Sequence, residues 1–322
     1  MENKSSFLIL TLLNLKGIGS AFIWKNLSQI KNGVESIVGV GDILEKCQKN
    51  IFPPEDIVVA EDMAYKTLQL CKESNIEIVN VFDSDFPNRF FSSSTKYPIL
   101  YLKGNWKNKN KNIGIIGSRK ASGIASEIAN RIGQFVSNND CSIVTGIAEG
   151  IDFAGTKSEL AASNCIGVVP AGLAFEKFNI LNKEYYKEAN RILESGGCLA
   201  SSFSPWIAQD QFKTVEYCKL QAALSDTLVL VQSDLDGGSK FTVDAFARTD
   251  RKLCIVNISK YDLNQLYYTV NDLIINKKNE GVSEWCGLKK DKILCNIEII
   301  ESKSDYQKII SIKSNTTGSQ LF

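Results

Sequence analysis

The chain has 322 residues, 44% of them hydrophobic and 23% charged, and its formal net charge is +1. This composition is that of an ordinary soluble globular protein, and the length allows two or three domains. With so little net charge, any binding of nucleic acid has to come from a local basic patch. Histidine is absent, which excludes Ser-His-Asp and Cys-His catalysis and histidine-ligated metal sites.

The nine cysteines include no Cys-x-x-Cys pair, which argues against structural zinc and predicts a reducing, cytoplasmic setting without disulfides. The apolar stretch at residues 7–13 is followed at once by Asn14 and Lys16 and by no small-residue cleavage site. We therefore expect no signal peptide. No apolar run approaches the length of a membrane span, so no membrane partner is expected.

The first fifty residues have helical periodicity and predict a small helical domain over residues 1–52. Within it, Gly17-Ile18-Gly19 separates two apolar-periodic segments. This pattern fits a helix-hairpin-helix, whose glycines let backbone amides approach a DNA phosphate, and it fits a plain αα-hairpin equally well. Two prolines at 53 and 54 then mark a domain boundary.

A regular alternation of short apolar runs and amphipathic stretches follows, and it predicts an α/β domain over residues 53–260. The expected strands are 76–81, 99–103, 113–117, 141–146, 165–169, 198–203, 227–231 and 253–257, and the expected helices include 58–74, 122–138, 155–163 and 183–195. Apolar strands joined by helices indicate a doubly wound, mostly parallel sheet of the Rossmann-like type. Residues 261–322 form an extension of unassigned role, with one helix expected in 261–281 and one strand in 293–302.

The stretch NIGIIGSRKASG, residues 112–123, breaks abruptly from buried isoleucines into Gly117, Ser118, Arg119 and Lys120. One interpretation is an anion site, in which turn amides and the arginine bind a phosphate. The other is an ordinary strand-to-helix turn with two solvated cations.

Two further glycine loops follow predicted strands. The second loop carries Gly146, Gly150 and Asp152, with the carboxylate placed to cap the next helix. The third, DGGSKFT, carries Gly238, Ser239 as the expected N-cap, and Lys240, and leads into a helix through residue 248.

Because ligands of doubly wound sheets bind beyond the carboxyl ends of the strands, the three loops predict a shared anion-binding groove. The alternative is that the glycines serve tight packing and the aspartate only caps. The first loop does not fit Gly-x-Gly-x-x-Gly, so NAD binding is disfavoured, and no cofactor or catalytic residue is predicted.

In order and spacing, the segments DSDFPNRF, IGIIGSRKAS, TGIAEGIDFAG, LSDTLVLVQS and GGSKFTVDAFARTDRKLCIVN resemble the bacterial DNA-processing family DprA/Smf, over about residues 83–257. The resemblance implies an extended Rossmann-like domain that binds single-stranded DNA and delivers it to a RecA recombinase. It also implies a homo-oligomer without established catalytic chemistry.

Carried over position by position, the resemblance assigns phosphate contacts to Gly117, Ser118 and Arg119, to the second-loop residues Gly146, Gly150 and Asp152, and to Gly238 and Ser239. This chain departs from the family pattern at three places. Glu149 stands where the family has an arginine, and Ser202 stands where it has a glutamate. The basic Arg-Asn-Arg run of the family aligns with Tyr217, Cys218 and Lys219. Fewer cations predict weaker binding with a flatter salt dependence. Tyr217, Phe212 and Trp206 either stack on bases in compensation or belong to the core.

Other functions fit parts of the sequence. The setting implied by the resemblance is DNA uptake, recombination, or an anti-phage or toxin-control system with a toxin partner. A nucleotide sensor or a phosphoribohydrolase-like enzyme would carry the motif PGGxGTxxE. The corresponding segment of this chain, DGGSKFTVD, has the paired glycines of that motif and has Asp244 where the motif has glutamate. A pure interaction protein would use residues 175–191, which an amphipathic core-covering helix explains as well.

Overall fold

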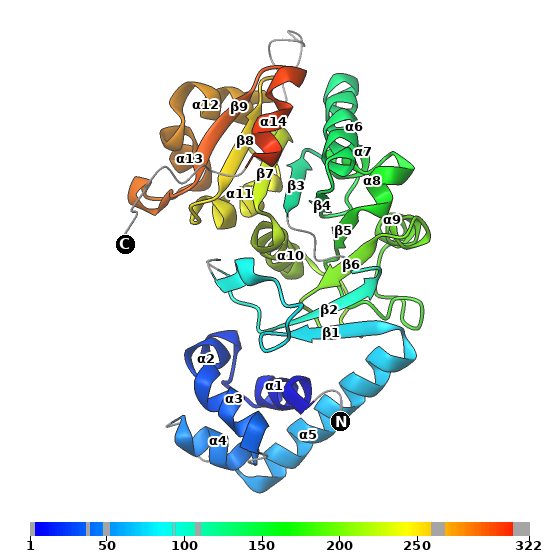
Figure 1. Cartoon of the computed structure of the whole chain (residues 1–322), viewed down its shortest axis with the longest axis vertical. Coiled ribbons are helices and arrows are strands. Elements are labelled where there is room, and N and C mark those ends of the chain that lie inside the picture. The colour runs from blue at the N-terminus through cyan, green and yellow to red at the C-terminus, as the bar shows by residue number, and fades with distance from the viewer. Residues whose placement is uncertain are drawn as a thin grey trace, which may run out of the picture.

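The computed structural model (Figure 1) describes residues 4–36, 39–47, 52–91, 93, 95–106, 111–258 and 268–311. Within them, one nine-stranded sheet has the order β1-β2-β6-β5-β4-β3-β7-β8-β9. The strands are β1 Ile76–Asn80, β2 Ile99–Gly104, β3 Asn112–Gly117, β4 Ser142–Thr145, β5 Cys165–Val168, β6 Cys198–Ser201, β7 Thr227–Gln232, β8 Lys252–Val256 and β9 Asn296–Ile300.

Strands β3 to β9 all run parallel to one another, whereas β2 is antiparallel to β6 and β1 is antiparallel to β2. The strand order reverses between β3 and β7, as in a doubly wound sheet. Every residue of β4 to β8 is buried, because helices cover both faces. The predicted fold class is confirmed.

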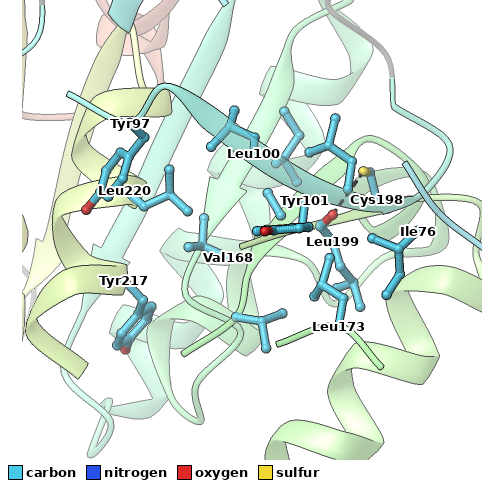
Figure 2. Packing of buried hydrophobic residues seen from close by; sticks show 14 of the residues in the cluster. Ile76, Tyr97, Leu100, Tyr101, Val168, Leu173, Cys198, Leu199, Tyr217 and Leu220 are labelled. Atoms are coloured by element: carbon cyan, nitrogen blue, oxygen red, sulfur yellow. Dashed lines mark hydrogen bonds between the residues drawn. The ribbon is translucent and has the colours of Figure 1, made fainter. Parts of the chain in front are cut away.

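Alternate residues of the strands face opposite helical layers. Ile115 packs in the cluster that includes α6 and α7, whereas Ile116 packs with α11 and α13 on the other face. One layer holds α6 Gly123–Asn138, α7 Ile151–Gly155, α8 Glu159–Ser163, α9 Lys183–Glu194 and α14 Tyr306–Ile310; the other holds α10 Gln211–Leu224, α11 Ser239–Ala247, α12 Thr269–Lys277 and α13 Asn279–Cys286. Figure 2 shows the apolar packing where β2, β5 and β6 meet α10.

Five helices form a unit at the antiparallel edge of the sheet (Figure 1): α1 Lys4–Asn14, α2 Ser20–Lys25, α3 Leu27–Ser36, α4 Val40–Lys46 and α5 Pro54–Glu73. Gly17 has φ +81°, so the chain turns between α1 and α2 where the two glycines predicted a hairpin. Trp24 holds the unit to the α/β body, since its ring centroid lies 5.1 Å from that of Phe91. Helix α5 packs along α1 as well as on β1, and the boundary at residues 52/53 stays a prediction.

Two single-helix predictions are wrong. Residues 155–163 are divided between α7 and α8, because the Ser158 side chain accepts the amide of Ala161 and starts a new helix. The predicted helix 261–281 is divided between α12 and α13 at Lys278, whose φ is +51°; its first part lies among residues 259–267, outside the described residues. The predicted C-terminal strand exists, and as β9 it pairs in parallel with β8.

Candidate nucleic-acid interface

An open groove of about 900 Å³ lies at the carboxyl edge of the parallel strands, between the loop that follows β4 and the first turns of α9. We call it the α9 groove. Helices that follow parallel strands begin at this edge, so the loops after β3 and β4 and the start of α9 converge there. The lining residues are Arg119, Ile147, Ala148, Glu149, Gly150, Phe153, Asn182, Lys183, Glu184, Tyr185, Lys187, Glu188 and Arg191.

The first two predicted loops are built against each other. Gly150 has φ +82°, and a Cβ atom there would lie 2.2 Å from the carbonyl oxygen of Ser118. That same carbonyl accepts the amide of Ile151 at 3.2 Å. At Gly117 a Cβ atom would lie 2.6 Å from the carbonyl oxygen of Gln232. Both glycines are therefore required by close backbone approach.

Most amides of the first loop are already engaged. The amide of Ser118 donates to the carbonyl of Gln232 at 2.7 Å, and that of Lys120 donates to the Ser118 hydroxyl at 3.1 Å. Ser122, the N-cap of α6, donates its own amide to the Gln232 side chain and accepts the amide of Ala125. An anion at this loop would therefore bind mainly to the exposed guanidinium of Arg119 and less to the backbone amides.

The charged side chains of the α9 groove are mixed in sign. Arg119 donates a hydrogen bond to the Tyr185 hydroxyl at 3.3 Å, which holds the guanidinium at the groove wall. Lys183 and Lys187 are exposed on α9, one turn apart. Helix spacing of four residues places both lysines on the same side.

Three acids line the groove together with these cations, and one of them, Glu184, is exposed beside Lys183 on α9. Glu149 is exposed on the second loop, facing the same groove. Glu188 is buried and pairs with Arg191, whose guanidinium also binds Thr156 and lies 5.3 Å from the ring centroid of Phe153. Phe153 is 42% exposed, so the groove presents an aromatic ring beside an anchored cation.

Asp152 lies beneath the groove rather than in it. Its side chain is buried, and Oδ2 accepts the amide of Gly146 at 3.0 Å. Burial raises the carboxyl pKa to about 7, against the opposing effects of the Gly146 hydrogen bond and of Arg119. The expected capping of its own helix is wrong: α7 has Gly150 at the N-cap and no side-chain cap, and the carboxylate closes the preceding loop instead.

The second loop contains a strained residue. Ile147 has φ +52°, which is rare for a β-branched residue. It is buried, and a Cβ atom on Gly167 would lie 2.6 Å from its Cγ2. Close packing therefore holds a loop conformation that the backbone alone disfavours.

The third predicted loop and Lys219 are not among the residues that line the α9 groove. Ser239 is the first residue of α11 and not its N-cap, which is Gly238; its hydroxyl lies 2.7 Å from that of Ser233. Lys219 is paired with Glu216 on α10 at 2.5 Å. Lys240 is half-buried and precedes Phe241 on α11. The structure thus brings the first two loops together and places α9 opposite them.

The family model of DNA recombination-mediator protein A matches residues 77–282, well over half of the chain. The chain belongs to this family. Protein Smf of Borreliella burgdorferi is 22% identical over 204 residues, and DNA processing protein DprA of Bacillus subtilis is 22% identical over 200 residues. These alignments cover 62% and 61% of this chain but only 62% and 66% of the two relatives.

Two solved structures have the same fold. DprA of Streptococcus pneumoniae superposes with a TM-score of 0.67 at 18% identity, covering 94% of this chain and 97% of that one. DNA processing protein A of Helicobacter pylori gives a TM-score of 0.53 at 21% identity, covering 63% and 89%. The high mutual coverage of the first agrees with the integration of both the N-terminal helices and β9 into this fold.

The resemblance aligned a basic run with residues 217–219, which lie on α10. Tyr217 and Cys218 are both buried here, and a Cβ atom on Gly146 would lie 2.7 Å from Cε2 of Tyr217. Figure 2 shows Tyr217 within the apolar cluster. Tyr217 therefore fills the space under the second loop and presents no face to a base. Phe212, at the exposed start of α10, is 87% exposed.

Sequence reasoning missed the α9 side of the groove. The pattern of residues 175–191 predicts a partner surface or a core-covering helix, and it does not distinguish Lys183, Lys187 and Arg191 as groove residues. The available signal was topological: a helix that follows a parallel strand starts at the ligand edge. Within the described part of the chain, no group of three or more Cys, Asp or Glu side chains is placed to hold a metal, and no helix has the length and apolarity to cross a bilayer.

Proposed function

We propose that this protein binds single-stranded DNA in the α9 groove and acts in DNA processing and recombination without a catalytic step of its own. The observation that carries the proposal is the position of Arg119, Lys183 and Lys187 around one open groove at the ligand edge of the sheet. Phosphates bind to such cations with counterion release, which requires no particular base sequence. DNA processing protein A of Helicobacter pylori has a single-stranded DNA binding mode, and this likeness supports single-stranded DNA as the ligand here.

Exposed aromatic rings suit a single strand more than a duplex, because only unpaired bases can stack on a side chain. Phe153 lines the groove, and Phe212 lies in the first turn of α10, a helix that follows β6 and so starts at the same edge of the sheet. Each stacked base typically contributes about 1–3 kcal/mol. We assign bases to these rings and phosphates to Arg119 and the α9 lysines.

The further roles follow the family resemblance: a homo-oligomer that hands its DNA to a RecA-like recombinase or, in a defence or toxin-control setting, works with a toxin partner. Light scattering tests whether the protein is a homo-oligomer, because an oligomer has a mass above that of one chain. Gene neighbourhood separates the two settings.

The test of DNA binding is fluorescence anisotropy of a labelled oligothymidylate over a salt series, with duplex as competitor. Arg119→Ala and the double variant Lys183→Ala, Lys187→Ala should each weaken binding and flatten its salt dependence, by about 0.7 in the log–log slope per lost phosphate contact. Lys66→Ala and Lys292→Ala remove exposed cations on α5 and near β9 and should bind like wild type. Equal loss in all variants, or no binding in low salt, would overturn the proposal; a nucleoside monophosphate binding in its place would favour the nucleotide-sensor function.

A further inference from the structure

The antiparallel edge of the sheet carries a second groove, which shares no lining residue with the α9 groove. A cavity of about 730 Å³ separates β1 from the second half of α5. Tyr65, Leu68 and Cys71 form its helical wall, and Ile76 and Ile78 lie on its strand side. Among the described strands, β1 stands at the end of the order and pairs with β2 alone, so its other side is an open edge of the sheet.

The register of β1 shows which backbone groups point into this space. The amide of Val81 donates to the carbonyl of Pro98, and these residues are direct partners in the continued β1–β2 register. In an antiparallel pair, hydrogen-bonded and non-hydrogen-bonded partners alternate. The backbone amides and carbonyls of residues 77, 79 and 81 therefore bond to β2. Those of residues 76, 78 and 80 point away from β2, toward the open edge.

Asn80 confirms this alternation, because its amide bonds to the Asp83 carboxylate at 2.8 Å and its carbonyl accepts the amide of Asp83 at 2.9 Å. The turn thus closes one end of the edge. Within the described part of the chain, no hydrogen bond reaches the outward amides and carbonyls of Ile76 and Ile78. These four backbone groups are what an added strand would bond to.

The charges around the groove select the occupant. Among the described residues that line it, one is a lysine, Lys72, and four are acids: Glu73, Glu77, Asp83 and Asp85. Glu73 is paired with Lys177 outside the groove at 2.6 Å, and Asp83 is used by the turn, which leaves Glu77 and Asp85 as the carboxylates offered to a ligand. A second copy of this edge is disfavoured, because pairing β1 with β1 would place like charges together.

We propose that the groove between β1 and α5 binds an extended, basic segment of a partner protein by strand addition to the free edge of β1. Main-chain hydrogen bonds to Ile76 and Ile78 supply the register, and lysines or arginines of the segment face Glu77 and Asp85. This surface is separate from the DNA groove, so the two ligands bind independently.

The probe is a fluorescein-labelled peptide, acetyl-Lys-Val-Lys-Val-Lys-amide, followed by anisotropy against the full chain. Its two controls are the same peptide with alternate backbone nitrogens methylated, which cannot complete a ladder, and the acidic peptide acetyl-Glu-Val-Glu-Val-Glu-amide. We expect saturable binding of the basic peptide only. Equal binding of the methylated peptide, preference for the acidic one, or no binding would overturn the proposal.

The double variant Glu77→Gln, Asp85→Asn should weaken binding of the basic peptide at least roughly fivefold, because two charge pairs are lost. Its binding of oligothymidylate should be unchanged. Ile78→Pro removes an outward amide without breaking the β1–β2 ladder, and Ile78→Val is its matched control. Only the proline variant should lose peptide binding. Should Ile78→Pro fail to fold, the methylated peptide still decides the outcome, because it probes the same bonds on the wild-type protein.

Discussion

Burial of Asp152 makes the stability of this protein depend on pH. Its pKa is about 7 in the folded chain, against an ordinary value of 3.8, so the folded state holds a proton that the unfolded state releases. The stabilisation from this proton is complete below pH 3.8 and is lost as the pH rises through 7. Relative to Asp152→Asn, the wild type should lose up to about 4 kcal/mol of unfolding free energy across that interval.

Urea unfolding of both proteins at a series of pH values measures this difference. Glu149→Gln, an exposed substitution on the same loop, serves as the control and should follow the wild type. A constant difference between wild type and Asp152→Asn at all pH values would show that the buried carboxyl keeps its ordinary pKa.

Glu149 stands where the resemblance implied an arginine, and it lines the α9 groove together with Arg119, Lys183 and Lys187. Glu149→Arg removes a repulsive charge and adds a phosphate partner. We expect roughly tenfold tighter oligothymidylate binding in low salt and a steeper salt dependence. Glu194→Arg makes the same charge change at the far end of α9 and should have little effect. Equal gains from both substitutions would indicate a general charge effect instead of a local contact.

At the scale of elements, the two loops of the groove depend on one close contact. Gly150→Ala forces a side chain into a left-handed conformation and against the Ser118 carbonyl. We expect a loss of at least about 2 kcal/mol in unfolding free energy, together with weaker DNA binding. Gly238→Ala is the matched control, since its φ is −62° and no atom lies within 4 Å of an added Cβ. Thermal melting compares the two, and a tolerated Gly150→Ala would contradict the coupling of the loops.

The same elements show what the sequence could predict. Strand positions and the parallel sheet followed from apolar runs such as residues 227–231, because burial on both faces leaves a local pattern. The packing role of Tyr217 could not be predicted from the sequence, because only the fold places this side chain under Gly146. The break at Ser158 also escaped prediction, because side-chain capping competes with helix continuation on nearly equal terms. The α9 wall of the groove required knowledge of which helices start at the same edge.

For the whole molecule, the C-terminal segment completes the sheet and is not an appendage. β9 covers the edge of β8, and Lys252 and Lys111 donate hydrogen bonds to carbonyls at the end of α14. A chain truncated after residue 260 would expose the cluster that Val282 and Trp285 complete on α13. We expect it to aggregate or to melt without cooperativity. A soluble truncated chain with an unchanged melting temperature would contradict this.

The proposed function requires single-stranded DNA to occupy the groove between the first two loops and α9. Hydrogen–deuterium exchange with and without oligothymidylate tests it directly across the whole chain. We expect slower exchange at residues 147–153 and 183–191, and unchanged exchange in the third loop at 234–240. Slower exchange confined to 234–240, or unchanged exchange in both 147–153 and 183–191, would place the DNA outside this groove and overturn the proposed function.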